Sequence, residues 1–293
     1  MKEKLLFILI TMVMCLFSLG AQAVITCTAP TSTGFSTAYS TTGVVPNTTQ
    51  GQVSFTCTRG LAGDAVIVYL RAGNGVNVCA GSNDASFAGS CIQYEAYINS
   101  SCTGQIWTST GAAAFISVNL ANVLTPQPFS INYWGCINTA GQNPAAGAGT
   151  YTDTVITQLK STSANVGGVI YNTSTFPVSI TFPASCTITS VGNVAFGTYT
   201  ALQTTSLVAP TANIVLNCTS KLPYTMSLDA NSGVVAGLNY SLTINALTPP
   251  VTSRGTGPAQ THSLVGTMAA NQAGTCATGV CAGTQTRTLT ITY

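Results

Sequence analysis

The sequence contains very little charge. Asp, Glu, Lys and Arg make up 5% of its 293 residues, whereas they make up about a quarter of an average soluble domain. The formal net charge is +2, and we expect no basic patch that would bind nucleic acid or anionic lipid. A surface with so few charges is poorly protected against association, which a protein destined for a polymer can tolerate.

Residues of common active sites are also scarce. His262 is the only histidine, and no G-x-S-x-G segment accompanies it, so a base beside a nucleophile is missing. Among the few acids, only Asp84 and Glu95 are placed where a carboxylate pair for hydrolysis is conceivable. No two cysteines have the C-x-x-C spacing that zinc sites commonly use. We therefore expect no enzyme, no cofactor and no metal.

A long apolar run occurs only at the N-terminus. Two lysines precede the apolar segment 5–19, and the A-x-A cleavage motif 21–23 follows it. The run is too short for a membrane span. This arrangement predicts a signal peptide over 1–23 and a mature chain that begins at Val24.

What the sequence does contain is a repeat. Three segments recur, in the same order, in the two halves of the chain. They are Cys57-Thr58 with Cys218-Thr219, 92–99 with 238–245, and 149–159 with 283–293. The shared order indicates a duplicated domain. We expect a first domain over 24–170, a linking segment over 171–185 and a second domain over 186–293.

Short runs of alternating apolar and polar residues, rich in β-branched and aromatic side chains, predict strands. The predicted strands are 52–58, 64–71, 91–98, 113–120, 129–133 and 152–159 in the first copy, and 213–219, 224–229, 238–246, 263–268 and 286–293 in the second. No helical apolar period follows the signal peptide. The sequence therefore predicts an all-β protein of two immunoglobulin-like antiparallel β-sandwich domains.

Ten cysteines remain once the signal peptide, with Cys15, is removed. An even number behind a signal peptide indicates disulfides in an oxidising compartment, here the periplasm. The repeat pairs Cys27 with Cys57 and Cys186 with Cys218, which are 30 and 32 residues apart. The remaining cysteines favour Cys79–Cys91, Cys102–Cys136 and Cys276–Cys281, and other connectivities stay open.

These segments resemble the spore coat protein U domain, which is the pilin fold of archaic, Csu-type chaperone–usher pili. The resemblance rests on Cys186, Phe196-Gly197-Thr198-Tyr199, Cys218-Thr219, 238–242 and the terminal Thr-x-Thr-x-Thr-Tyr. The first copy is less similar, because 35–39 replaces Phe-Gly-x-Tyr. The second copy departs from the family at 283–287, where Arg287 stands in place of the Asp of Gly-x-Tyr-x-Asp; the first copy keeps that pattern at 149–153.

The resemblance implies assembly by β-augmentation. Domains of this family lack a final strand, and a periplasmic chaperone and then the N-terminal extension of the next subunit fill the gap. Filling the gap removes an edge that would otherwise aggregate. We therefore expect the second domain to lack its final strand. The resemblance places its chaperone and subunit groove at Thr288, Leu289, Ile291 and Tyr293.

The segment between the copies predicts a donor strand that completes the first domain in cis. Its apolar residues, at every second position, are Phe176, Val178, Ile180 and Phe182. Pro177 argues against this, because proline donates no hydrogen bond to a ladder, and the alternative is the first strand of the second copy. Only residues 24–26 precede Cys27, too few for a donor strand. A subunit that accepts a strand but donates none belongs at a pilus tip.

The alternation of strand direction predicts which loops face away from the second domain. These are the loops near 40–50, 72–90 and 121–128. Their apolar residues, which we expect to bind a surface, are Val44, Val45, Val76, Val78, Phe87, Val123 and Leu124. Packing of these side chains into the core is the alternative, and an extra strand would instead nominate Ile106, Trp107 and Trp134.

The sequence thus predicts a tip adhesin of a chaperone–usher pilus, which mediates surface attachment and biofilm formation through apolar loops. The expected partners are a periplasmic pilus chaperone, an outer-membrane usher, the next pilin subunit and a surface or sugar ligand. The expected location is the periplasm in transit and then the extracellular pilus tip. One alternative is a carbohydrate-binding tip, with Trp107, Tyr133 and Trp134 stacked on sugar. Another is a self-assembling secreted coat protein.

Overall fold

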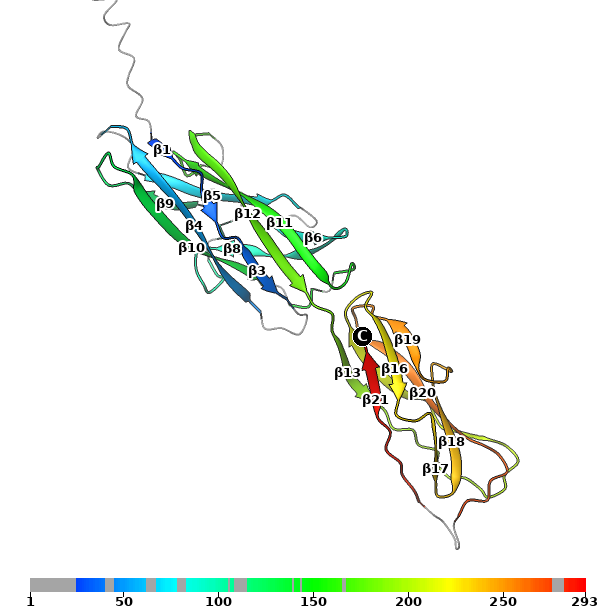
Figure 1. Cartoon of the computed structure of the whole chain (residues 1–293). Coiled ribbons are helices and arrows are strands. Elements are labelled where there is room, and N and C mark those ends of the chain that lie inside the picture. Colours follow the sequence, from blue (N-terminus) through cyan, green and yellow to red (C-terminus); the bar gives the residue numbers. More distant parts are fainter. Residues whose placement is uncertain are drawn as a thin grey trace, which may run out of the picture.

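The computed structural model describes residues 25–39, 45–61, 67–77, 83–104, 106–107, 115–138, 140–142, 144–164, 167–275 and 282–293. These residues are all-β, and they include no helix long and apolar enough to cross a membrane. The strands form two bodies that lie end to end (Figure 1). We call them the N-terminal body, with strands β1 to β12, and the C-terminal body, with strands β13 to β21.

The N-terminal body has two sheets. The first joins β1 (Ile25–Cys27), β4 (Asn47–Arg59), β10 (Gln127–Ile137) and β8 (Glu95–Tyr97), with β2 (Thr31–Ser32) on β4. The second joins β3 (Phe35–Ala38), β12 (Ile170–Phe182), β11 (Gly149–Lys160), β5 (Ile67–Gly75) and β9 (Phe115–Asn119), with β6 (Asp84–Phe87) on β11 and β7 (Ser90–Gln93) on β6. Every second side chain along β11 is buried, and residues of both sheets form one apolar core.

Strand β12 lies inside the second sheet of the N-terminal body, between β11 and β3. It buries four apolar side chains, those of Phe176, Val178, Ile180 and Phe182. Pro177 lies opposite Thr154 and is exposed, and the register continues through it. The pairing with β11 is antiparallel but the pairing with β3 is parallel, so the expectation of wholly antiparallel sheets is wrong here. Parallel neighbours need a long connection, and most of the N-terminal body separates β3 from β12.

The C-terminal body also has two sheets. The larger joins β13 (Cys186–Val191), β15 (Ala212–Cys218), β20 (Gln260–Met268), β18 (Leu238–Ile244) and β17 (Ser232–Val235), with β14 (Leu207–Val208) on β20. The smaller joins only β19 (Val251–Arg254), β16 (Pro223–Leu228) and β21 (Leu289–Thr292). A second, separate apolar core belongs to this body.

The predicted strands match the longer observed ones, with shifted ends. The predicted strand 91–98 is broken at Tyr94, whose N–H donates to the carbonyl of Asn83 at 3.0 Å, so β7 and β8 are separate. The last predicted strand, 286–293, is shorter, because β21 covers only Leu289–Thr292. The sequence analysis missed short strands such as β2 and β14, since two residues hold no detectable alternation.

Residues 183–185 connect the two bodies, and Thr219 ties them to the C-terminal body. Its Oγ1 donates toward the carbonyls of Pro183 and Ser185, at 3.3 and 3.2 Å, and accepts the N–H of Ser185 at 3.1 Å. The hydroxyl of Ser220 donates to the carbonyl of Ala145 in the N-terminal body at 3.2 Å. The connection is therefore short and hydrogen-bonded.

Three of the expected disulfides are present: Cys27–Cys57, Cys102–Cys136 and Cys186–Cys218. The first and third occupy equivalent places, because each joins the first strand of a body to the strand beside it. Cys91 is also disulfide-bonded. The expected partner Cys79 and the expected pair Cys276–Cys281 lie outside the described residues.

Candidate binding surfaces

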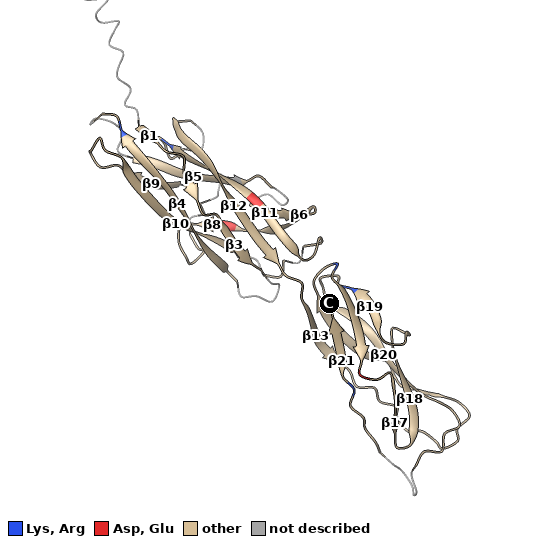
Figure 2. Cartoon of the chain, in the orientation of Figure 1, with Lys and Arg blue, Asp and Glu red and all other residues tan. Residues whose placement is uncertain are grey.

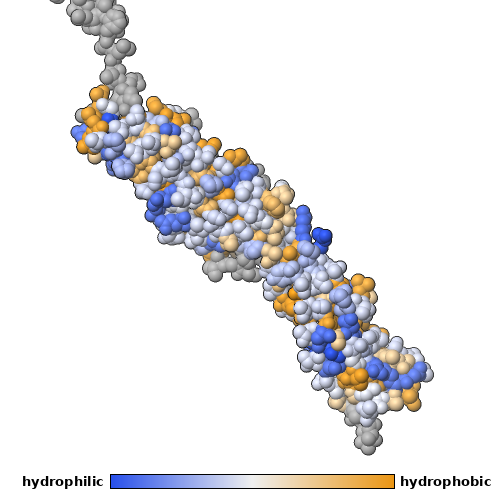
Figure 3. Space-filling view, in the orientation of Figure 1, coloured by the Kyte–Doolittle hydropathy of each residue, from blue (hydrophilic) through white to orange (hydrophobic). Residues whose placement is uncertain are grey.

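Exposed apolar side chains gather at the end of the N-terminal body that lies farthest from the C-terminal body (Figures 1 and 3). The chain leaves β4 and enters β10 and β12 at this end. We define the outer patch as Leu61, Val123, Leu124, Val169 and Ile170, which are between 44% and 59% exposed. Carbon-rich groups on projecting loops lose water favourably when they meet an apolar surface.

The loop that carries Val123 and Leu124 is fixed by the side chain of Gln127. The N–H of Ala121 donates to Oε1 of Gln127 at 2.7 Å, and Nε2 of Gln127 donates to the carbonyl of Ala121 at 3.2 Å. The buried Arg59 donates to the same carbonyl at 3.4 Å. The loop is therefore held open to solvent by polar contacts at its base.

The loop that carries Val169 is fixed in the same way. The N–H of Ser161 donates to the carbonyl of Val169 at 2.9 Å, and the N–H of Val169 donates to the Ser161 hydroxyl at 2.8 Å. The buried Lys160 donates to the carbonyl of Ala164 at 3.2 Å. Gly167 and Gly168 turn the chain with φ of 83° and 73°, a region that other residues rarely adopt.

Buried cations thus support the outer loops. Arg71 donates to the carbonyl of Ser163, and burial lowers the pKa of its guanidinium. Lys and Arg lie toward this end of the N-terminal body in Figure 2, and the acids lie farther along it. Each cation satisfies loop carbonyls, and buried charges need such partners.

The seven predicted surface residues do not share one end of the molecule. Val123 and Leu124 belong to the outer patch. Val45 is partly buried. It lies near the other end of the N-terminal body, since it precedes β4, whose first residue, Asn47, lies opposite Ile137 at the end of β10. The ring of Phe87, 39% exposed, packs on Tyr151 with centroids 5.4 Å apart, also near the end of β12.

Val76 is 66% exposed, and its N–H donates to Thr154 in the middle of β11. Val44 and Val78 lie outside the described residues. The described members of this set therefore do not form one surface: Val123 and Leu124 lie at the outer end, whereas Val45, Val76 and Phe87 lie elsewhere on the N-terminal body. Sequence reasoning also missed Leu61, Val169 and Ile170; the only signal was their position beside glycine-rich turns.

Two of the three aromatic residues of the alternative sugar platform belong to the core. Trp107 and Tyr133 are fully buried. Their ring centroids lie 5.0 Å apart, and each also packs on Phe176 of β12. Trp134 packs against the small cluster around the Cys102–Cys136 disulfide, together with Ile106. Trp107 and Tyr133 therefore offer no open stacking platform, and Trp107 does not belong to a binding end.

Acidic groups gather around one buried tyrosine of the N-terminal body. The hydroxyl of Tyr94 donates to the Asp153 carboxylate at 2.6 Å. Burial, that hydrogen bond and the nearby charges of Asp153, Glu95 and Asp84 raise the pKa of Tyr94. Nδ2 of Asn83 donates to Glu95 at 2.7 Å. No group of His, Cys, Asp and Glu among the described residues is arranged to hold a metal ion.

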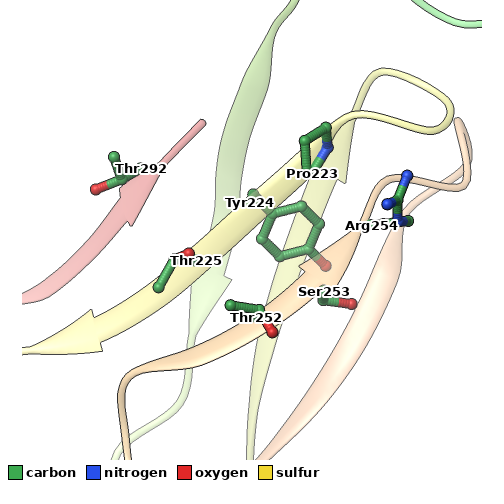
Figure 4. Close-up of a pocket in the computed structure, with 7 residues that line it drawn as sticks. All are labelled: Pro223, Tyr224, Thr225, Thr252, Ser253, Arg254 and Thr292. Carbon is green, nitrogen blue, oxygen red and sulfur yellow. The ribbon is translucent and has the colours of Figure 1, made fainter.

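His262 lies inside the C-terminal body. Its Nε2 is 2.7 Å from the Tyr224 hydroxyl, and its Nδ1 is 2.8 Å from Nδ2 of Asn245. Burial lowers the pKa of His262 and favours the neutral ring. Near this residue, a shallow hollow of about 400 Å³ lies along β16 and β19, as Figure 4 shows. Its lining residues are Pro223, Tyr224, Thr225, Thr252, Ser253, Arg254 and Thr292.

The last strand of the C-terminal body forms a second candidate surface. β21 pairs with β16, and no other described strand pairs with it. Leu289 and Ile291 pack only partly on the core. Thr288 and Tyr293 are exposed. In the N-terminal body, the equivalent strand β11 pairs with β12 on the side where no described strand pairs with β21.

Comparison with known proteins assigns the family. The model of the Spore Coat Protein U domain matches residues 13–158 and 172–254. No curated protein sequence matches the chain. The chaperone–tip adhesion subunit complex CsuC–CsuE, from archaic chaperone–usher Csu pili of Acinetobacter baumannii, is 14% identical; it covers 91% of this chain and 100% of its own, with a TM-score of 0.39.

The CupB6 tip adhesin of Pseudomonas aeruginosa is 8% identical, and the match covers 92% of this chain and 94% of that chain with a TM-score of 0.35. The family match extends over most of this chain and spans both bodies. The chain belongs to the Spore Coat Protein U domain family.

Proposed function

We propose that this chain is the tip adhesin of a chaperone–usher pilus. Its N-terminal body attaches to apolar surfaces through the outer patch, and its C-terminal body joins the pilus by accepting a strand. The observation that carries this proposal is the asymmetry between two equivalent strands. β11 pairs with β12, whereas no described strand pairs with β21 on the equivalent side.

In the N-terminal body, β12 acts as a donor strand supplied in cis. It inserts Phe176, Val178 and Ile180 into the N-terminal core and leads, through residues 183–185, directly to β13. By the same rule, the segment before the first strand of a following subunit fills the gap beside β21. This is β-augmentation by a neighbouring chain.

The outer patch is the proposed site of attachment. It lies at the end of the N-terminal body farthest from the C-terminal body, which carries β21 (Figure 1), so attachment and assembly use different bodies. Ile25–Cys27 is already paired with β4 and is not available as a donor. A periplasmic chaperone would protect β21 before assembly, and an outer-membrane usher would place the chain on the cell surface. Surface attachment and biofilm formation follow.

Adsorption of the purified mature chain to an alkyl-coated sensor tests the adhesive role. Replacement of Val123 and Leu124 by Asp removes two exposed apolar side chains and should weaken binding at least about tenfold. The matched control is Val234→Asp, because Val234 is 55% exposed but lies on the C-terminal body. Equal binding by both variants would overturn the role of the outer patch.

Co-purification tests the assembly role. The mature chain is purified from the periplasm with and without a peptide that copies a pilin N-terminal extension. We expect a stable product only with a chaperone or the peptide. A stable monomer without either would mean that both bodies are complete, and would favour a free secreted protein.

A further inference from the structure

The two bodies carry the same tyrosine with partners of opposite charge. In the N-terminal body, the Tyr94 hydroxyl donates to the Asp153 carboxylate at 2.6 Å. In the C-terminal body, the Tyr240 hydroxyl accepts from Nε of Arg287 at 2.9 Å and donates to Oε1 of Gln285 at 2.6 Å. The repeat that aligns 149–159 with 283–293 places Asp153 opposite Arg287 in sequence.

Packing around the two tyrosines supports this equivalence. Phe35 meets Tyr94 with ring centroids 5.4 Å apart, and Phe196 meets Tyr240 at 5.7 Å. Each phenylalanine also lies over a glycine of the neighbouring strand: a Cβ added to Gly135 would meet Phe35, and one added to Gly266 would meet Phe196. The two sites therefore have one architecture.

The filled N-terminal site shows what a strand meets at this position. Val178 of β12 lies opposite Asp153 on one side and opposite Phe35 on the other. Asp153 accepts hydrogen bonds from Tyr94, from the N–H of Asn77 at 3.1 Å and from the N–H of Thr154 at 2.7 Å. An apolar valine is compatible with a carboxylate so well provided with donors.

Arg287 has a different requirement. Besides its Tyr240 contact, Nη2 donates to the carbonyl of Ser232 at 2.7 Å, and Nη1 lies 3.7 Å from the carboxylate of Asp229. Asp229 itself is 45% exposed. Within the described residues, these contacts occupy only part of the five N–H donors of a guanidinium. A strand laid beside β21 would take the remaining donors out of water, which is costly without an acceptor.

We infer that the strand completing the C-terminal body carries a hydrogen-bond acceptor, best a carboxylate, at the position that Val178 holds in β12. The occupant is the N-terminal extension of the next pilin subunit, and this inference rests on the proposed function. The neighbouring inward positions stay apolar, since they face Leu289 and the partly buried core. The Arg287 site therefore discriminates an incoming strand from a copy of β12, which carries valine there.

Peptide binding to the full mature chain tests the inference. The probes are four labelled peptides that copy residues 170–183: the native sequence and the substitutions V178D, V178N and V178K. Binding is followed by fluorescence anisotropy. We expect V178D to bind about tenfold tighter than the native peptide, because a charge-assisted hydrogen bond replaces an unpaired donor. V178N should lie between them, and V178K should bind most weakly.

Variants of the chain locate the effect. With Arg287→Gln, the preference for V178D should fall below about twofold, and with Arg287→Lys most of it should remain. A peptide with F176D, which faces Leu289, should bind weakly to every chain. Equal binding of the native and V178D peptides would overturn the inference, but it would still be consistent with the proposed assembly role. Binding of no peptide would overturn both the inference and the proposed assembly role.

Discussion

The two bodies of this protein share a sequence repeat but differ in what lies beside two equivalent strands, β11 and β21. In the N-terminal body, Val155 and Thr157 of β11 are fully buried, because β12 covers the edge of their sheet. Their counterparts in the C-terminal body, Leu289 and Ile291, are only partly buried on β21. The same pattern of residues thus makes a closed or an open core, depending on whether a further strand pairs with it.

The polar residues beside that strand differ as well. Asp153 is buried with Tyr94, whereas Arg287 bridges Tyr240 and the exposed Asp229. A closed site holds its charge with internal donors. An open site keeps its charge near water until a partner arrives, which allows that charge to select the partner.

The largest effect should come from placing polar side chains on the buried face of β12. Replacement of Val178 and Ile180 by Asn puts two polar side chains at positions that are 1% and 0% exposed. Together they should cost about 5 kcal/mol and unfold the N-terminal body alone, as seen by calorimetry with two transitions. The matched control, Thr175→Asn with Thr181→Asn on the exposed face, should leave both transitions unchanged. An unchanged profile for the core variant would refute β12 as a cis donor.

The next effect concerns the disulfide that joins the first strand of each body to the strand beside it. Replacing Cys186 and Cys218 by Ala removes a link across 32 residues, worth about 3 kcal/mol. The C-terminal body should lose its cooperative transition, because Leu289 and Ile291 are only partly buried and no described strand covers the second side of β21. The same change at Cys27 and Cys57 should lower the transition of the N-terminal body without abolishing it. If the N-terminal body proves the more sensitive, β12 is not what stabilises it.

A smaller difference should separate the two tyrosines. Tyr94→Phe leaves the buried Asp153 carboxylate short of one donor and should cost about 2 kcal/mol. The Tyr240 hydroxyl bonds to the exposed Gln285 and the partly exposed Arg287, which water can reach, so Tyr240→Phe should cost less than about 1 kcal/mol. Urea unfolding of each variant measures both values. Equal costs would mean that the C-terminal site is as closed as the N-terminal one.

The smallest effect is a dependence on pH that only the C-terminal body should show between pH 7 and 5. Burial beside Tyr224 and Asn245 lowers the pKa of His262 below its unfolded value, so the unfolded state binds the proton more readily. Stability is then complete above the unfolded pKa of about 6.5 and falls as pH decreases below it. His262→Gln should flatten the melting temperature of that body over this range. A slope that survives the substitution would point to another group.

Much of the fold could be predicted from the sequence, because it depends on local, repeated patterns of residues. The two-residue period of Phe176, Val178 and Ile180 predicted a strand with one buried face. The repeat aligned Cys27–Cys57 with Cys186–Cys218, and both pairs are present. Tyr133 and Trp107 were also readable as core, although a sugar platform was the competing interpretation.

The outer patch could not be predicted from the sequence in the same way. Val123 and Phe87 were expected together, but β10 begins at one end of the body while β6 and the start of β11 lie toward the other. Whether loops meet depends on how many strands separate them and on where each strand ends. Strands of two to four residues, such as β2 and β6, reverse or shift the chain without leaving a periodic signal.

Alternation, cysteine spacing and motif order are local properties of the chain, and they suffice to predict the all-β class, the duplication, the family and the apolar face of β12. The three-dimensional pairing was needed to show that β12 runs parallel to β3, and that Arg287 contacts Tyr240 as Asp153 contacts Tyr94. These depend on pairing between distant segments. In such pairing, burial and hydrogen bonding of the whole sheet, rather than the preference of any one segment, select the register.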